Sequence, residues 1–235
     1  MRSVFLYRAN GLAVTGRVSR PVAEVLQAQG ASVLAPIGGD GMAALPAFAS
    51  ASGAVGFQGA VTTVAGHANA PDRAQSTVNV VIRGLDLGNG LVTADGIDLT
   101  LNSDHVQGQD ADITPSVTFD NLRILGQPFA PSLQQVVFTK TTWPALRASG
   151  LSPAEDGTGW ISTSLFLPWQ AGDPGVAAGG GGCGLRVPGR GTVYLGEYLV
   201  SSESRRLSLL RVELEGTYAG SVVVGYAETN GHWYP

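Results

Sequence analysis

Residues 76–101 read STVNVVIRGLDLGNGLVTADGIDLTL, and this stretch decides the fold. In its first part, Val78, Val80 and Ile82 fall on one face and Thr77, Asn79 and Arg83 on the other, which is the period of two of a half-buried β-strand. In its second part the inward positions are 92 and 94, and then 97, 99 and 101. The two runs are joined by Gly-Asn-Gly at 88–90, and both residue types tolerate the positive φ angles of tight turns. The stretch therefore predicts an antiparallel β-hairpin.

The same alternation recurs along the chain, in short runs bounded by Gly, Pro, Asn or Asp. With the hairpin, these runs give about ten strands, at the spacing typical of a sandwich or barrel. The sequence thus predicts an all-β protein, an antiparallel two-sheet sandwich that is jelly-roll-like and has long Gly/Pro-rich loops. The further strands are expected at residues 4–19, 53–65, 116–125, 135–141, 159–167, 191–200, 207–215 and 220–228.

Two segments show a helical pattern. Residues 21–29 place Val22, Val25 and Leu26 at i, i+3 and i+4 between a proline and Gly30, and residues 143–150 offer one further turn. Residues 35–52 are expected as an extended arm or packed loop, and residues 171–190 as a long mobile loop, because both are rich in Gly and Pro. A boundary could fall at 128–132, but strand patterning resumes directly, so we expect one β-sandwich domain over residues 1–235.

Composition limits the classes of function. The net charge is −4, with 14 Lys and Arg against 18 Asp and Glu, and this lacks the basic footprint of a nucleic-acid-binding protein. No run reaches about 18 consecutive apolar residues, so no membrane span is expected. The single cysteine, Cys183, excludes an intramolecular disulfide; it is a passive thiol or, alternatively, the source of a bridge between chains.

The N-terminal segment 1–8 begins like a signal peptide. Arg8 and Asn10 interrupt it, and no apolar core of sufficient length follows, so it is not one. Two alternatives remain for the location: an intracellular protein, or a mature or recombinant form of an exported one.

Few residues could carry chemistry. Residues 179–184 formally contain G-x-G-x-x-G, but the residues that follow cannot begin the helix that a dinucleotide loop needs. His67, His105 and His232 have no G-x-S-x-G nucleophile elbow to act with. Neither catalytic residues nor a cofactor are predicted, and a glycoside hydrolase with carboxylates distant in the sequence stays a third alternative.

The densest polar cluster is acidic. Oxygen-rich loops bind Ca²⁺ through six to eight ligands, but the spacing here is not that of an EF-hand. We interpret these carboxylates as solubilising loop residues and predict no metal site. The cluster consists of Asp95, Asp98, Asp104, Asp110, Asp112 and Asp120.

Two aromatic sites point to binding. Trp169 is the best-placed tryptophan for a platform that stacks on sugar rings, and it carries the alternative hypothesis of a carbohydrate-binding module, with calcium near residues 104–120 as an option. The segment 228–235 is unusually aromatic for a chain end. Leaving Trp233 and Tyr234 in water would forgo several kcal/mol, so we predict them as interface residues that dock on their own sandwich or on an adjacent subunit.

One region resembles a known family. Residues 85–87 (Leu-Asp-Leu) and 90–94 (Gly-Leu-Val-Thr-Ala) precede a strand that ends Leu-Arg-Ile-Leu-Gly at 122–126. This arrangement resembles the choice-of-anchor P proteins of Gram-positive bacteria. The resemblance implies an exported, β-rich surface protein without known catalysis.

The leading functional hypothesis is a non-enzymatic structural subunit that self-assembles into a bacterial surface or extracellular fibre or shell. Low charge reduces repulsion between identical copies, and unpaired strand edges offer them partners. The N-terminal region could also donate a strand to a neighbour. The predicted partner is therefore a second copy of the chain, with a glycan as the alternative partner and neither nucleic acid nor a membrane span involved.

Overall fold

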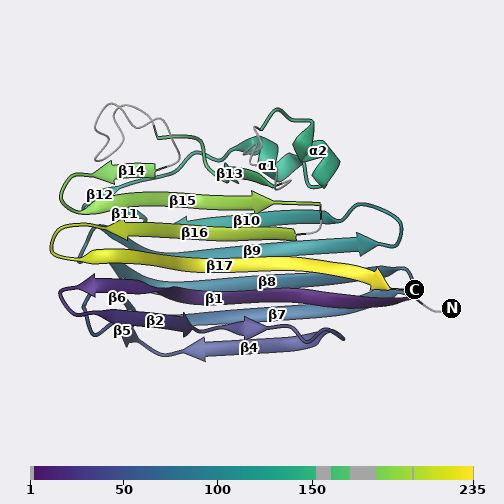
Figure 1. Cartoon of the computed structure of the whole chain (residues 1–235), viewed down its shortest axis with the longest axis horizontal. Helices are drawn as coiled ribbons and strands as arrows, with labels where there is room; N and C mark the ends of the chain where they lie inside the picture. The colour runs from purple at the N-terminus through teal and green to yellow at the C-terminus, as the bar shows by residue number, and fades with distance from the viewer. Residues whose placement is uncertain (1–2, 152–159, 170–183, 203, 235) are drawn as a thin grey trace.

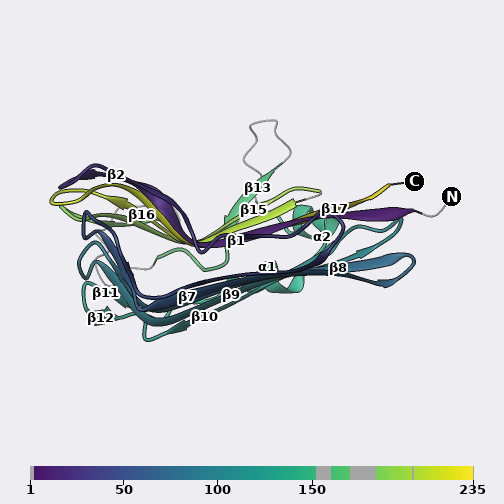
Figure 2. The same cartoon turned by 90° about the horizontal axis from the view of Figure 1, so that it is seen from below.

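The computed structural model describes residues 3–151, 160–169, 184–202 and 204–234. Two antiparallel sheets pack face to face (Figures 1 and 2), which confirms the predicted all-β sandwich. The buried apolar residues form one core cluster, with members on both sides of residues 128–132.

The first sheet has eight strands, taken from the two ends of the chain. They are β1 (Val4–Arg20), β2 (Glu24–Gln29), β3 (Ser32–Val33), β13 (Ile161–Ser164), β14 (Gly184–Val187), β15 (Gly191–Val200), β16 (Ser204–Leu214) and β17 (Ala219–Tyr234). Their order is β13-β15-β16-β17-β1-β2, with β14 beside β15 and β3 beside β1. The first and last strands pair along their whole length, from Val4 opposite Tyr234 to Arg20 opposite Ala219.

The second sheet has nine strands, taken from the middle of the chain. They are β4 (Gly39–Leu45), β5 (Phe48–Ala49), β6 (Val55–Phe57), β7 (Gly59–Ala70), β8 (Arg73–Leu87), β9 (Val92–Val106), β10 (Asp112–Asp120), β11 (Arg123–Ile124) and β12 (Gln127–Pro128). Its body is the run β4-β7-β8-β9-β10, with β6 and β5 beside β8, and β11 and β12 beside β9. Two short helices, α1 (Gln135–Thr139) and α2 (Trp143–Arg147), follow β12.

The predicted hairpin is confirmed as β8 and β9. The predicted inward residues of both strands are buried. Gly88, Asn89 and Gly90 form the turn with φ angles of 61°, 51° and 78°, the left-handed region that Gly and Asn tolerate. The Asp86 carboxylate accepts a hydrogen bond from the Gly90 amide at 2.7 Å, and Arg190 donates to the Gly88 carbonyl at 2.7 Å. Side chains from both sheets thus fix this turn.

The first sheet is bent across a row of four neighbouring residues. On both sides of this row the residues of neighbouring strands pair in the same register. The residues of the row itself are not paired with one another. The inward and outward faces of each strand also exchange here, because two consecutive residues are buried on every strand. Gly196 and Gly225 have φ angles of 61° and 66°, which turn the backbone. This bend row consists of Gly196, Leu209, Gly225 and Ala13.

A second bend row crosses the facing sheet. Gly84, with a φ of 62°, and Asp95 are missing from the otherwise continuous β8–β9 register. The neighbouring Asn121 has a φ of 50°, and its amide donates to the Asp95 carboxylate at 2.9 Å. The two rows divide the sandwich into two halves, and Figure 2 shows both sheets bending between them.

The two halves differ in the side chains that fill them. In the half away from the chain ends, the wide half, the buried strand residues are apolar and mostly large, such as Leu87, Leu195 and Val212. In the half that carries the chain ends, the narrow half, β1 turns Ala9, Gly11 and Ala13 toward the partner sheet. The strands of that sheet bury large residues here, such as Leu99 and Leu101, and Figure 2 shows the sheets close together. A Cβ on Gly11 would lie 2.7 Å from Val78 Cγ1, so only glycine permits this approach of β1 to the second sheet.

The predicted helix at residues 21–29 is wrong, because the chain forms β2 from Glu24 to Gln29. Only Leu26 of the expected apolar stripe is buried, whereas Val22 and Val25 are 51% and 69% exposed. The segment pairs with β1, with Val25 opposite Arg17. An available strand edge therefore overrides the local helical pattern.

The predicted strand at residues 135–141 is also wrong. Residues Gln135–Thr139 form α1, in which the Thr139 hydroxyl donates to the Gln135 carbonyl at 3.0 Å and only Val137 is buried. A short apolar run fits either element, and here it packs as a helix beside β10 instead of pairing with that edge strand. The one-turn helix expected at 143–150 is confirmed as α2.

The two expected irregular segments contain strands. Residues 35–52 form β4 and β5, because β7 offers β4 a continuous ladder from Gly39 opposite Gly66 to Leu45 opposite Ala60. Of the loop expected at 171–190, residues 171–183 lie outside the described residues, and Gly184–Val187 form β14.

Candidate functional site

A polar cluster lies inside the narrow half, between the sheets. Ser76 of β8, Ser103 of β9 and Thr229 of β17 join their hydroxyls in a triangle with edges of 2.7, 2.8 and 3.0 Å. The His105 ring extends it, with Nε2 3.2 Å from the Ser103 hydroxyl. The cluster ties the first sheet to the second through buried hydrogen bonds.

Arg205 is the largest fully buried side chain, with an exposure of 0%, and it borders this cluster on β16. Its Nη1 donates to the carbonyls of Ser201 and Ser204. Nε and Nη2 have no partner among the described residues, and neither has the hydroxyl of Tyr198, which is also 0% exposed. Burial lowers the pKa of Arg205 and raises the pKa of Tyr198 to about 12.

His105 is neutral at ordinary pH. Burial, above all, lowers its pKa to about 4, and the charges of His232 and Arg205 lower it further, while Asp104 opposes them. The ring packs on Phe5 with centroids 4.8 Å apart. His105 is thus a core residue without an exposed face for catalysis.

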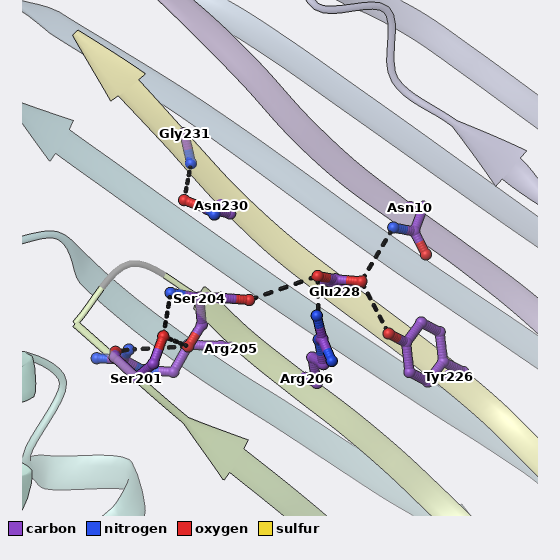
Figure 3. A network of polar contacts seen from close by, with 9 residues as sticks. All are labelled: Asn10, Ser201, Ser204, Arg205, Arg206, Tyr226, Glu228, Asn230 and Gly231. Carbon is purple, nitrogen blue, oxygen red and sulfur yellow. Dashed lines mark hydrogen bonds and ion pairs between the residues drawn. The ribbon is translucent and has the colours of Figure 1, made fainter. Parts of the chain in front are cut away.

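The outer face of the narrow half carries a second network, centred on Glu228 (Figure 3). Its carboxylate accepts hydrogen bonds from the Tyr226 hydroxyl at 2.9 Å, Arg206 Nε at 3.1 Å and the Asn10 amide at 3.3 Å. Burial raises the pKa of Glu228, but the bonds from Tyr226 and Asn10 and the charge of Arg206 together lower it below its usual value. The network links β1, β17 and β16, which are neighbours in the sheet.

The predicted acidic cluster does not come together as a site. Asp104 pairs with Arg73, Asp98 accepts from the Asn79 amide at 2.8 Å, and Asp95 accepts from Asn121. The bond from Arg73 is the main reason that the pKa of Asp104 is lowered. Among the described residues, no three His, Cys, Asp or Glu side chains gather in a group that could hold a metal ion.

Trp169 lies beside two adjoining pockets, but its ring face is covered by the protein. Phe129 stacks on it, with ring centroids 4.6 Å apart and planes inclined by 24°. The larger pocket, of about 500 Å³, is lined by Phe119, Phe129 and Phe166, whereas Trp169 lines only the smaller one of about 90 Å³. The arrangement favours packing over the sugar platform expected at this residue.

The aromatic chain end lies on its own sheet. Trp233 is paired opposite Phe5, with ring centroids 5.1 Å apart, and it packs against the core. Tyr234 is half exposed and lies opposite Val4 at the end of the ladder. Both residues therefore dock within the chain, and their role toward another subunit stays a prediction.

One border of the sandwich, the lower border in Figure 1, is lined by exposed apolar side chains, and we term it the apolar edge. β4 pairs with β7 and, among the described residues, has no strand on its other side. Its seven residues include Met42, which is 71% exposed, one acidic residue, and neither Pro, Lys nor Arg. The exposed side chains of the apolar edge are Val22, Val25, Val33, Ile37 and Met42, between 51% and 85% exposed.

The opposite edge strand of the same sheet is protected. β10 contains Pro115 and is bounded by Asp112 and Asp120, and proline and charge are the devices that keep edge strands from pairing. In addition, the Ile113 amide donates to the carbonyl of Thr141, next to α2, at 3.2 Å. Of the two edge strands β4 and β10, only β4 thus lacks this protection.

These features define a β-sandwich protein in which, among the described residues, the β4 edge is unpaired and apolar. Residues 5–150 match the model of a family described as a domain of unknown function (DUF8256), and since this is more than half of the chain, the chain belongs to that family. The match runs from β1 to the end of α2. No curated protein and no solved structure matches the chain. None of the described helices is long and apolar enough to cross a membrane.

Proposed function

We propose that the chain is a non-enzymatic structural subunit that associates with copies of itself through the apolar edge. The observation that carries the proposal is β4, a seven-residue edge strand without the proline or positive charge that usually protects such an edge. A second β4 can add to it through main-chain hydrogen bonds, with the exposed side chains of both copies packing alongside.

Charge and position support this mode of association. Asp40 is the only charged residue of β4, and it pairs with His67 at 3.1 Å, so two copies meet with little repulsion. Glu24 holds the border together, because it accepts hydrogen bonds from the amides of Ala51 and Ser52 at 3.1 and 3.0 Å. The edge is therefore presented by a braced segment rather than by a free arm. Assembly at a bacterial cell surface is part of the proposal.

The test is the oligomeric state of the full chain, measured by light scattering after size exclusion and by electron microscopy. We expect the wild type to associate as its concentration rises. The double variant Met42→Lys/Ala44→Lys should stay monomeric, because both side chains are exposed on β4 and would bring like charges together.

The matched control places the same two charges on the protected edge. Ser116→Lys/Thr118→Lys alters two exposed residues of β10 and should associate like the wild type. A wild type that stays monomeric at high concentration, or a β4 variant that assembles unchanged, contradicts the proposal.

A further inference from the structure

The end of the narrow half contains a pocket of about 780 Å³, a size typical of small-molecule sites. It lies at the end of the molecule where N and C are marked in Figure 2, between the β1–β17 pair and the turn from β7 to β8. Its lining includes Phe5, Tyr7, Ile37, His67, Asn69 and Trp233.

Three aromatic rings form its wall, and glycines hold them in place. The rings of Tyr7 and Trp233 each pack edgewise on Phe5, with centroids 4.8 and 5.1 Å away. A Cβ on Gly66 would lie 2.8 Å from the Tyr7 ring, and a Cβ on Gly231 would lie 2.1 Å from the Phe5 ring. Backbone without side chains thus fixes the rings before any ligand arrives, which reduces the entropy lost on binding.

Two polar atoms in this wall have no partner among the described residues. They are the hydroxyl of Tyr7, a side chain only 6% exposed, and the indole Nε1 of Trp233. An unsatisfied buried donor costs about 1–3 kcal/mol, and a ligand that completes its hydrogen bonds recovers that free energy. Each of the two atoms has less than 1 Å² of accessible surface, so a ligand hydroxyl reaches it only when this part of the wall adjusts on binding.

The rim of the pocket is polar, and its lining includes, among the described residues, no Asp, Glu, Lys or Arg. His67 Nε2 lies 3.1 Å from the Asp40 carboxylate, and the Asn69 amide donates to Gln75. A charged ligand would find no counter-charge of Asp, Glu, Lys or Arg in this lining. The chemistry therefore selects a neutral molecule that has both C–H-bearing faces for aromatic rings and hydroxyls for unpaired polar atoms.

We infer that this pocket binds a neutral saccharide, one sugar ring packing on Trp233 while its hydroxyls satisfy the two unpaired groups. The site is separate from the apolar edge used for self-association. It also differs from Trp169, whose ring is stacked on Phe129.

The experiment is isothermal titration of the full chain with cellohexaose, chitohexaose, laminarihexaose and maltohexaose. We expect at least one of them to bind with a stoichiometry of one per chain. Trp233→Ala should weaken that binding at least about tenfold, and Tyr7→Phe, which removes only the hydroxyl, about threefold or more. Because Trp233→Ala could also disturb the β1–β17 pair, the exposed His67→Ala serves as a second variant, with a loss of about threefold.

Trp169→Ala is the matched control and should bind like the wild type. The association-deficient Met42→Lys/Ala44→Lys variant should also bind unchanged, which separates this inference from the proposed function. The inference is overturned if none of the four oligosaccharides binds at up to about 10 mM, or if binding survives in all three pocket variants. Loss of binding in Trp169→Ala alone would overturn it too, by placing the saccharide at the other site.

Discussion

The wide half and the narrow half of this sandwich are made by the same strands, yet their interiors differ in polarity. In the wide half, Leu and Val side chains separate the sheets. In the narrow half, Gly11 and Ala13 of β1 face the other sheet, and the buried residues include Ser76, Ser103 and Thr229. The comparison teaches that a long strand can serve two purposes. Both halves bury large apolar side chains, and the narrow half adds polar groups and the aromatic pocket.

Truncation in the wide half should have the largest effect. Leu87 is fully buried, and Leu87→Ala should lower the free energy of unfolding by about 3–4 kcal/mol, through lost apolar contact and the cavity left behind. Urea denaturation at neutral pH measures this loss. Leu199→Ala is the control, because Leu199 is 38% exposed and its loss should be several-fold smaller. Equal losses in the two variants would contradict the role given to the wide half.

Lowering the pH should destabilise the protein through His105, which is buried in the narrow half. His105 takes up a proton near pH 6.5 when unfolded but only near pH 4 when folded, so the unfolded state binds more protons between these values. Stability is therefore complete above pH 6.5 and falls as the pH drops, by about 3 kcal/mol in total.

The free energy of unfolding is best measured as a function of pH between pH 6.5 and 4.5. In this window Glu228 remains ionised, because its pKa is lowered from 4.5. His105→Gln should flatten the dependence of the unfolding free energy on pH, measured in urea. The assignment fails if the variant keeps the wild-type slope.

Replacing a glycine of the narrow half by alanine should lower the free energy of unfolding by a somewhat smaller amount. In Gly11→Ala the new methyl would lie 2.7 Å from Val78 Cγ1 and 3.0 Å from Thr62 Cγ2, both on branched side chains that have little room to move. We expect a loss of about 2 kcal/mol in chemical denaturation. Gly56→Ala in the wide half is the counterpart, since its nearest neighbour is the Phe48 carbonyl at 3.7 Å, and it should change stability by less than about 0.5 kcal/mol. A harmless alanine at 11 would show that the sheets do not approach as closely as described.

Substitutions of ion-paired side chains on the outer faces of the sheets should have the smallest effects on stability. Glu228→Gln removes the charge from a carboxylate that is only 9% exposed, and it should cost about 1 kcal/mol at pH 7. Arg186→Gln breaks the ion pair with Glu215, 3.3 Å away, but those side chains are 69% and 45% exposed, so the loss should be smaller. The melting temperatures of the two variants measure this difference. A larger loss in the exposed pair than in Glu228→Gln would contradict the prediction.

The sequence predicted those parts of the fold whose neighbours are local. The β8–β9 hairpin is one. Its bend was not predicted, although the inward positions expected from the sequence change phase between Ala94 and Ile97. The β2 and α1 segments were assigned the wrong element, because each short apolar pattern fits either a helix or a strand. Only pairing decides between them, as it does for β2 and the preceding β1.

The candidate sites were predictable only in part. The aromatic chain end marks Trp233 as a residue that docks, but its partner Phe5 is at the other end of the chain. Tyr7 and Arg205 carry no local signal, since each is one polar residue in an alternating strand. Their importance comes from the burial and the missing partners that the opposite sheet imposes.

The bend rows have a consequence for local opening. Because Gly196, Leu209, Gly225 and Ala13 are left out of the register at one level, every ladder of the first sheet from β15 to β1 is interrupted at the same place. Local opening that starts at one end of the sheet has to cross this bend row before it reaches the other half. Amide hydrogens should therefore exchange with solvent as two cooperative groups, those near the chain ends first and those around Leu210, Val212 and Val224 last.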